Sequence, residues 1–414
     1  MAEDISPFAA TASAMGYLYQ LRIALLRCTD LLESGASWTV AIEAGDDIEC
    51  VQDEKTGLWQ LKHRAEGTRI TDGTSDLWKS LRVWAVAARA GAIDLDTADL
   101  FLLTTAEAPP ASAAMHLSQA PGDRRDPAEA HRLLREARNA ARSRQQKKAE
   151  ANPDTTAKPS ELYQAWDALG EPEQLRLLER IQILHRAEDI HATGTRLQGR
   201  AAIAVGRQFA TSFLERLEGW FFQRVIAQMG TSAGPVTGIE FDEAFSSRRD
   251  QFRPDNLPID DDVIKLPDES HLHSDKTFVR QLSLTGIGSA RVRIAVRDWL
   301  RASTQRDRWS NENLLRPGEI DIYERRLTEE WEVRFEAMRD DLGEQVAEEA
   351  MTAAAKALYR WVEQEARYSI RPGCEEPFVT TGSFHMLADG LDVGWHPQYA
   401  ARLMTLLEPA GSRS

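Results

Sequence analysis

Two stretches of the first 107 residues carry apolar side chains at helical spacing. The first, 16–35, ends in Ser34–Gly35, a pair that favours a helix stop. The second, 75–91, begins at Ser75, a suitable N-cap, and ends at Gly91. The pattern therefore predicts two amphipathic helices.

Strand-like runs lie between and after these two helices. Three short runs follow one another at 38–45, 46–52 and 58–64. The polar segment Asp53–Gly57 ends in glycine and predicts a hairpin turn between the last two. The run at 99–105, which is apolar from Leu100 to Leu103, is typical of a buried strand. The predicted order is helix, strand, strand, strand, helix, strand.

The composition changes after Ala106. A loop rich in Ala and Pro leads into an Arg- and Lys-dense helical stretch at 128–150, and 161–230 and 289–370 indicate almost only helix. The basic stretch can contact phosphate backbone or be a solvated arm. We expect an α/β domain followed by a mainly helical region, with segments at 1–107 (mixed α and β), 108–160 (linker and basic arm), 161–285 (helical) and 286–414 (mainly helical).

Charge and cysteine content narrow the class of protein. The formal net charge of -15 over 414 residues restricts any DNA contact to a local positive patch. Three scattered cysteines form neither a disulfide framework nor a zinc knuckle. No basic and apolar leader opens the sequence, and no apolar stretch is long enough to span a membrane. We expect a cytoplasmic protein with no membrane contact.

Candidate chemistry gathers around the predicted hairpin. Asp46 and Asp47 precede one strand, and Gln60 and Lys62 lie on the next. Because side chains alternate along a strand, Gln60 and Lys62 share a face, and the hairpin can place an aspartate opposite them. Carboxylate and amide oxygens suit Mg²⁺ or Mn²⁺, and a lysine beside the cation can orient water and offset charge. These residues predict phosphodiester hydrolysis.

Two points stay open within this group. Asp47 directly precedes the apolar strand residue and is favoured as the metal ligand, although Asp46 is the alternative. Gln60 offers a neutral oxygen where a carboxylate is common, which lowers the ligand charge. The other interpretation makes both aspartates turn residues and Lys62 an exposed strand lysine.

The arrangement resembles the restriction-endonuclease-like (PD-(D/E)xK) superfamily. More narrowly, it looks like the double-strand DNA endonuclease domain of CD-NTase-associated antiphage effectors, through Gly16–Gln20 (GYLYQ), Glu43–Ile48 (EAGDDI) and Gln60–His63 (QLKH). The resemblance implies that Asp47 and Gln60 hold the cation and Lys62 is catalytic. It also brings Glu43 and Gln20 to the site.

Basic residues near this group are candidate phosphate contacts. They are His63 and Arg64 after the third strand, and Lys79 and Arg82 on one face of the 75–91 helix. A solvated helix face is the alternative for the last two. Trp78 and Trp84 on that helix are interpreted as core residues rather than base-stacking platforms.

The C-terminal part holds a second, weaker candidate. His385 and Asp389 have the i, i+4 spacing of two ligands on a helix, and His396 could be a third, although packed histidines explain the segment better. The stretch TGSFHMLADGLDVGWHPQY resembles the C-terminal domain of effectors of ABC-three-component antiphage systems, the Lamassu type among them. That resemblance implies docking and oligomerisation, with an SMC-like (Rad50-like) ATPase and a small accessory subunit as partners.

Together these patterns predict a metal-dependent double-strand DNA endonuclease that serves as the effector subunit of an antiphage or antiplasmid complex. We expect it to be inactive until its partners sense foreign DNA, and to form a homo-oligomer when active. The alternative is a non-catalytic DNA-binding or scaffold subunit with a degenerate nuclease fold. A hydrolase built on His385, Asp389 and His396 is a third possibility.

Overall fold

The computed structural model divides the chain into two compact units, Met1–Ser247 and Arg248–Ser414. The described residues are 7–35, 37–43, 45–119, 122, 124–151, 161–230, 232–267, 273–343 and 346–407.

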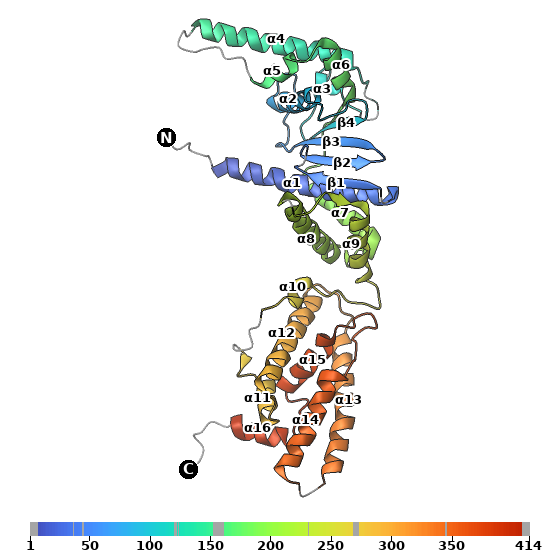
Figure 1. The fold of residues 1–414 in the computed structure, drawn as a ribbon, viewed down its shortest axis with the longest axis vertical. Helices are drawn as coiled ribbons and strands as arrows, with labels where there is room; N and C mark the ends of the chain where they lie inside the picture. The colour runs from blue at the N-terminus through green and yellow to red at the C-terminus, as the bar shows by residue number, and fades with distance from the viewer. Residues whose placement is uncertain are drawn as a thin grey trace. The chain divides into compact units, whose positions relative to one another are not determined.

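A six-stranded sheet organises the first unit, with strand order β5-β4-β3-β2-β1-β6 (Figure 1). The strands β3, β4 and β5 run parallel, and the pairs β3–β2, β2–β1 and β1–β6 are antiparallel. The bounds are β1 Trp38–Ile42, β2 Ile48–Gln52, β3 Lys55–Lys62, β4 Ala98–Thr104, β5 Ile181–Leu184 and β6 Val236–Thr237.

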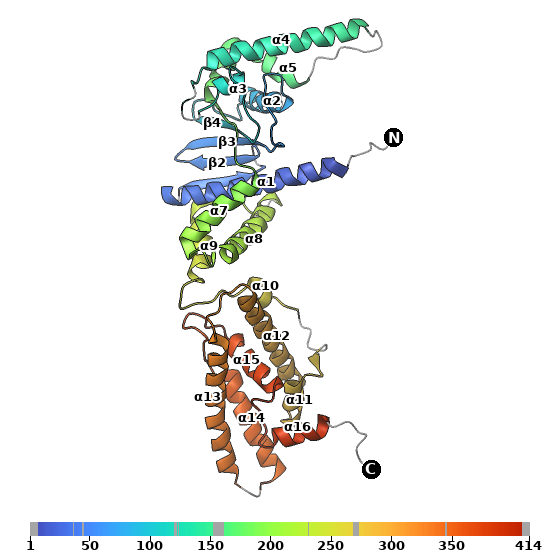
Figure 2. The ribbon, with the colours of Figure 1, turned by 180° about the vertical axis from the view of Figure 1, so that it is seen from behind.

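Two groups of helices pack against this sheet. The helices α1, α7 and α8 contact one another, and α1 and α8 contact β1; α6 contacts β4, and α4 packs on α3 and α6 (Figures 1 and 2). Their bounds are α1 Pro7–Leu31, α2 Ser75–Arg89, α3 Ala113–His116, α4 Pro127–Ala151, α5 Glu161–Asp167, α6 Glu171–Arg180, α7 Ile190–Val205, α8 Ala210–Met229 and α9 Gly238–Asp250, with the short 3₁₀ helix η1 Leu32–Ser34.

The predicted order of helix, three strands, helix and strand is confirmed by α1, β1, β2, β3, α2 and β4. The strand ends differ from the prediction. β1 stops at Ile42 because Glu43 takes a left-handed conformation, with φ at 53°. The hairpin turn is only Asp53–Glu54, both at positive φ, so Lys55 already belongs to β3.

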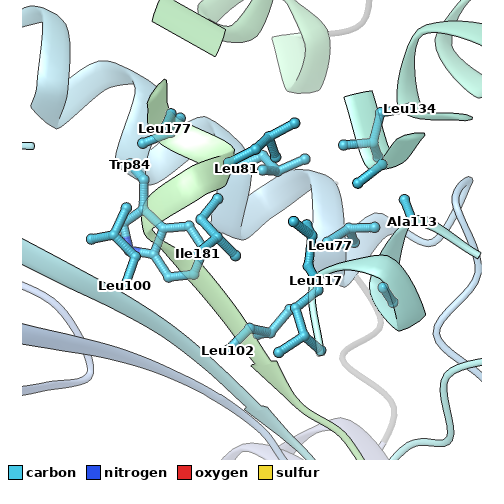
Figure 3. Packing of buried hydrophobic residues seen from close by; sticks show 14 of the residues in the cluster. Leu77, Leu81, Trp84, Leu100, Leu102, Ala113, Leu117, Leu134, Leu177 and Ile181 are labelled. Atoms are coloured by element: carbon cyan, nitrogen blue, oxygen red, sulfur yellow. The ribbon is translucent and has the colours of Figure 1, made fainter. Parts of the chain in front are cut away.

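A hydrophobic core joins α2 to the parallel strands (Figure 3). Leu77, Leu81 and Trp84 of α2 are fully buried against Leu100 of β4 and Ile181 of β5. This packing fixes α2 against β4 and β5.

The sheet extends beyond the predicted nuclease segment, which ended at residue 107. The strands β5 and β6 come from 181–184 and 236–237, inside the segment interpreted as helical. β5 pairs in parallel with β4 and continues directly from the last residue of α6, Arg180. The first compact unit therefore includes the basic helix and the predicted helical middle region as far as Ser247, and the remainder of that region belongs to the second unit.

The basic stretch forms the helix α4, and its arginines are largely engaged in ion pairs. Arg132 pairs with Glu129 and Glu136, at 2.6 Å in each case. Arg138 and Arg142 both bind Asp167 of α5. This segment therefore offers much less free positive charge than its composition suggests.

The second unit is helical, as predicted. Its core contains Tyr359, Phe384 and Trp395, and α15 is buried along most of its length against α12. No described helix of either unit is both long and apolar enough to cross a membrane. The bounds are α10 Asp261–Ile264, α11 Thr277–Leu284, α12 Ser289–Asn311, α13 Glu319–Leu342, α14 Glu348–Gln364, α15 Pro377–Asp389 and α16 Tyr399–Leu407.

Candidate functional site

The β2–β3 hairpin brings Asp47, Gln60 and Lys62 together. The backbone N–H of Leu61 donates to Asp47 Oδ2 at 2.6 Å, which holds this carboxylate against β3. Lys62 Nζ lies 3.6 Å from the same oxygen and donates to Gln60 Oε1 at 2.8 Å. Gln60 and Lys62 share a face of β3, while Leu61 between them is buried on the other. The three residues thus form one contiguous group. Asp47 and Gln60 supply oxygen atoms that could bind a cation, and Lys62 supplies an ammonium.

The neighbouring aspartate, Asp46, faces the interior. It is 8% exposed and accepts hydrogen bonds from the Gln60 amide, from Trp84 Nε1 at 2.8 Å and from the Asp47 N–H at 3.1 Å. Burial raises the pKa of Asp46 to about 6, although the hydrogen bonds from Trp84 and Gln60 oppose that shift.

The two adjacent aspartates therefore have different surroundings. Donors surround Asp46, whereas the side chain of Asp47 is 16% exposed and lies beside Lys62. A cation that arrives from solvent can reach Asp47 more readily. This geometry favours Asp47 over Asp46 as a ligand.

Glu43 and Gln20 complete the polar group. The N–H of Glu43 donates to the Asp47 carbonyl at 3.2 Å, which closes the loop between β1 and β2. Partial burial and the negative charge of Asp47 raise the pKa of Glu43, while a hydrogen bond from Gln20 and the charge of Lys62 lower it. The Gln20 side-chain oxygen on α1 is buried and has no hydrogen-bond partner.

The donor set fits a hard divalent cation. Two carboxylates, Glu43 and Asp47, repel each other, and two amide oxygens, on Gln20 and Gln60, stand beside them. Mg²⁺ and Mn²⁺ prefer oxygen donors, and a cation here would relieve the repulsion. The described part of the chain contains no group of three His, Cys, Asp or Glu residues arranged for a metal. Amide oxygens would therefore have to supply part of any coordination shell.

The four candidate phosphate contacts differ in availability. Arg64 is committed to Asp76 of α2 through two hydrogen bonds, of 2.6 and 2.5 Å. Lys79 on α2 is exposed, and Arg82 is half-buried. His63 packs on the ring of Tyr19 with ring centroids 5.0 Å apart, and its Nε2 has no hydrogen-bond partner. Arg64 and Lys79 are both exposed, but Arg64 is bound to a carboxylate, so Lys79 is the more available positive charge.

Some residues of this region carried no sequence signal. Trp78 and Trp84 are fully buried, so their interpretation as core residues is confirmed. The hydrogen bond from Trp84 to Asp46 nevertheless connects α2 to the site, and nothing in the helical periodicity indicates it. The same holds for Asp76, a buried carboxylate that binds the guanidinium of the exposed Arg64.

The C-terminal candidate residues have separate partners. Asp389 Oδ1 accepts from the N–H of Thr277 at 2.7 Å and so caps α11. His385 lies 3.3 Å from the Tyr359 hydroxyl, and complete burial lowers its pKa to about 3. His396 Nδ1 accepts from a backbone N–H at 3.1 Å. These are structural hydrogen bonds, and the geometry gives no support to a metal centre here.

Comparison with known proteins identifies a domain in the second unit. Residues 278–403 match the family described as C-terminal domain 7 of the ABC-three component (ABC-3C) systems. No curated protein matches the sequence.

Solved structures give weaker similarities. One is the Acinetobacter baumannii Cap4 SAVED/CARF-domain containing receptor with the cyclic trinucleotide 3′3′3′-cAAA, at TM-score 0.31 and 12% identity, covering 70% of this chain and 69% of that one. The same receptor with 2′3′3′-cAAA gives TM-score 0.30 and 12% identity, covering 70% and 66%. At such values the similarity supports no conclusion about this chain.

Proposed function

We propose that this chain is the effector nuclease of an ABC-3C antiphage system, a Mg²⁺- or Mn²⁺-dependent endonuclease that cuts double-stranded DNA. The observation that carries the proposal is the convergence of Asp47, Gln60 and Lys62, with the Lys62 ammonium 2.8 Å from one candidate ligand and 3.6 Å from the other. The order α1, β1, β2, β3, α2, β4 supports a restriction-endonuclease-like domain. The fold contributes only by analogy, and the site carries the argument.

Within the proposed site, the residues of the chain would have separate roles. Asp47, fixed by the Leu61 N–H, and the oxygen of Gln60 would hold the cation, with Glu43 and Gln20 at its edge. The Lys62 side chain is 17% exposed, so its ammonium can approach a phosphate and offset the negative charge that develops there. A bound cation would polarise the phosphate and acidify the attacking water.

The charge distribution supports an enzyme that depends on assembly. The net charge is -15, Arg64 is paired with Asp76, and the arginines of α4 named above are paired with acids. Such a surface binds DNA weakly by itself because affinity for duplex DNA comes mainly from free Lys and Arg near phosphates. Partner subunits, which we propose to be an SMC-like ATPase and a small accessory protein, would bring DNA to the site. Two copies related by a two-fold axis would cut both strands.

The test is a cleavage assay with the purified chain, alone and with its partner subunits, on supercoiled and linear DNA in Mg²⁺ or EDTA. The proposal expects double-strand breaks in Mg²⁺, none in EDTA, and much faster cleavage by the assembled complex. Equal cleavage by the isolated chain would contradict control by assembly. Absence of cleavage by the complex would favour a scaffold subunit.

A further inference from the structure

The Gln60 amide lies between two groups of opposite charge. Its Nε2 donates to Asp46 Oδ1, and its Oε1 accepts from Lys62 Nζ at 2.8 Å. Rotating the amide by 180° would place its NH₂ against the ammonium and its oxygen against the carboxylate. Both contacts would then be repulsive. Asp46 and Lys62 together therefore select one of the two amide orientations.

This orientation matters because only one end of an amide can bind a cation. The oxygen of Gln60 faces Lys62, which in turn lies 3.6 Å from Asp47 Oδ2. The NH₂ group faces away, toward the buried Asp46. The candidate ligand oxygens of Gln60 and Asp47 are thus on the same side of the amide.

Asp46 is itself held rigidly. Its Oδ2 accepts from the indole N–H of Trp84 at 2.8 Å, and its Oδ1 also accepts from the backbone N–H of Asp47 at 3.1 Å. Trp84 is fully buried in the core that joins α2 to the parallel strands. Because both of its oxygens already accept hydrogen bonds, Asp46 is poorly placed to meet a cation itself. A continuous buried support therefore runs from the core at Trp84 through Asp46 to Gln60.

We propose that Asp46, held by Trp84, is a positioning residue that orients the Gln60 amide so that its oxygen faces the cation. The proposal rests on the proposed function, since it assigns the support of that same site. Asp46 touches neither cation nor DNA, and Asp47 does the coordinating. Groups that orient metal ligands in this way commonly change affinity or activity about 10- to 100-fold when removed.

The pair also explains why glutamine suits position 60. A glutamate there would place a second carboxylate against the buried Asp46, whereas glutamine donates to Asp46 and still offers an oxygen to the site. Exchanging the carboxylate and the amide between positions 46 and 60 should restore the hydrogen bond. In D46N/Q60E, the amide introduced at position 46 would donate to the carboxylate introduced at position 60, and that carboxylate would still accept from Lys62.

The experiment measures Mn²⁺ affinity by isothermal titration calorimetry on the full-length chain, alongside DNA cleavage by the assembled complex. The variants are D46N, Q60E and D46N/Q60E, with K62A as the control for the proposed function. We expect D46N to weaken Mn²⁺ binding and cleavage about 10- to 100-fold. We expect the double variant to bind Mn²⁺ at least about 5-fold more tightly than D46N, because the complementary pair is restored.

The outcomes separate the two claims. If K62A loses cleavage while D46N keeps wild-type Mn²⁺ affinity and cleavage, the positioning role is wrong and the nuclease function stands. A second outcome is that wild type binds Mn²⁺ and D46N does not, while neither protein cuts DNA. In that case the positioning role stands and the nuclease function is wrong. If wild type binds no Mn²⁺, both are wrong.

A second variant covers the case in which D46N fails to fold. W84F keeps a buried aromatic ring and removes the N–H that holds Asp46, together with the carbon atoms of the five-membered ring. We expect a loss of Mn²⁺ affinity of about 3- to 10-fold in W84F, smaller than in D46N because Asp46 itself remains. Unchanged affinity in a folded W84F would overturn the proposed support by Trp84.

Discussion

The indole N–H of Trp84 donates to Asp46 Oδ2 at 2.8 Å across 38 positions of sequence. This hydrogen bond joins α2, which packs on the parallel strands, to the loop before β2. The same aspartate accepts from Gln60, so the hydrophobic core and the candidate ligands belong to one structure. Changes in the core of the first unit are therefore expected to reach the site.

Asp47→Asn tests the assignment of the metal ligand. Its carboxylate accepts from Leu61 N–H and pairs with Lys62. Mn²⁺ at about 100 times its Kd stabilises a binding-competent protein by about 2.7 kcal/mol. We expect Mn²⁺ to raise the Tm of wild type and to leave that of Asp47→Asn nearly unchanged, as measured by scanning calorimetry. An equal Tm shift in both proteins would exclude Asp47 as a ligand.

Lys79→Ala and Arg64→Ala are expected to have different effects. Lys79 is exposed, whereas Arg64 is bound to the buried carboxylate of Asp76. Loss of one phosphate contact should reduce the slope of log K against log salt by about one in Lys79→Ala. Arg64→Ala should leave that slope unchanged and lower the Tm, because Asp76 loses its partner. DNA-binding titrations of the assembled complex at several salt concentrations give the slopes of both variants. A reduced slope in Arg64→Ala would show that Arg64 contacts DNA.

Gly382→Ala tests the packing of α15 on α12 in the second unit. A Cβ at this glycine would overlap the Asp298 carbonyl oxygen and the Ala302 methyl group. Backbone cannot move aside as a flexible side chain can, so we expect a loss of about 3 kcal/mol in the free energy of unfolding of this unit. Gly219→Ala on α8 is the control, because no atom lies within 4 Å of its added Cβ. Urea denaturation should separate the variants, and equal midpoints would contradict this packing.

His385 gives the second unit a pH dependence. Burial lowers its pKa from 6.5 to about 3, so the folded protein keeps it neutral while the unfolded chain binds a proton below pH 6.5. The stability that depends on a neutral His385 is therefore present above pH 6.5 and is lost as the pH falls toward 3. One such group lowers the free energy of unfolding by about 1 kcal/mol when the pH falls from about 6.5 to about 5.5. Denaturation of wild type and His385→Gln at both pH values checks this. The free energy of unfolding of the variant should fall by about 1 kcal/mol less than that of wild type. Equal losses in the two proteins would contradict the assignment.

The sequence predicted the order of elements around the site because each of those elements has a clear periodicity. It did not predict β5, since Ile181–Leu184 follows α6 without a break and a short, largely apolar run there also fits a helix. β6 has only two residues, Val236 and Thr237, which is too few for a pattern. Both strands are defined by their pairing with distant strands, so the end of the domain could not be read from local sequence.

The candidate site was predictable only in part. The spacing of Gln60 and Lys62 and the hairpin predicted that they face an aspartate, and the structure places Asp47 beside them. Asp46 and Asp47 are adjacent and chemically identical, so only their surroundings distinguish them. The engagement of Arg64 by Asp76 likewise depends on how α2 packs.

The central claim is tested most directly by the rate at which the assembled complex linearises supercoiled plasmid in Mg²⁺. Three proteins are compared: wild type, Lys62→Ala and Lys55→Ala, the last being a matched control at the exposed hairpin end of the same strand. We predict wild-type rates for Lys55→Ala and a loss of at least about 100-fold for Lys62→Ala, with partner binding and Tm unchanged in both. Cleavage by Lys62→Ala at the wild-type rate would contradict the assignment of this site.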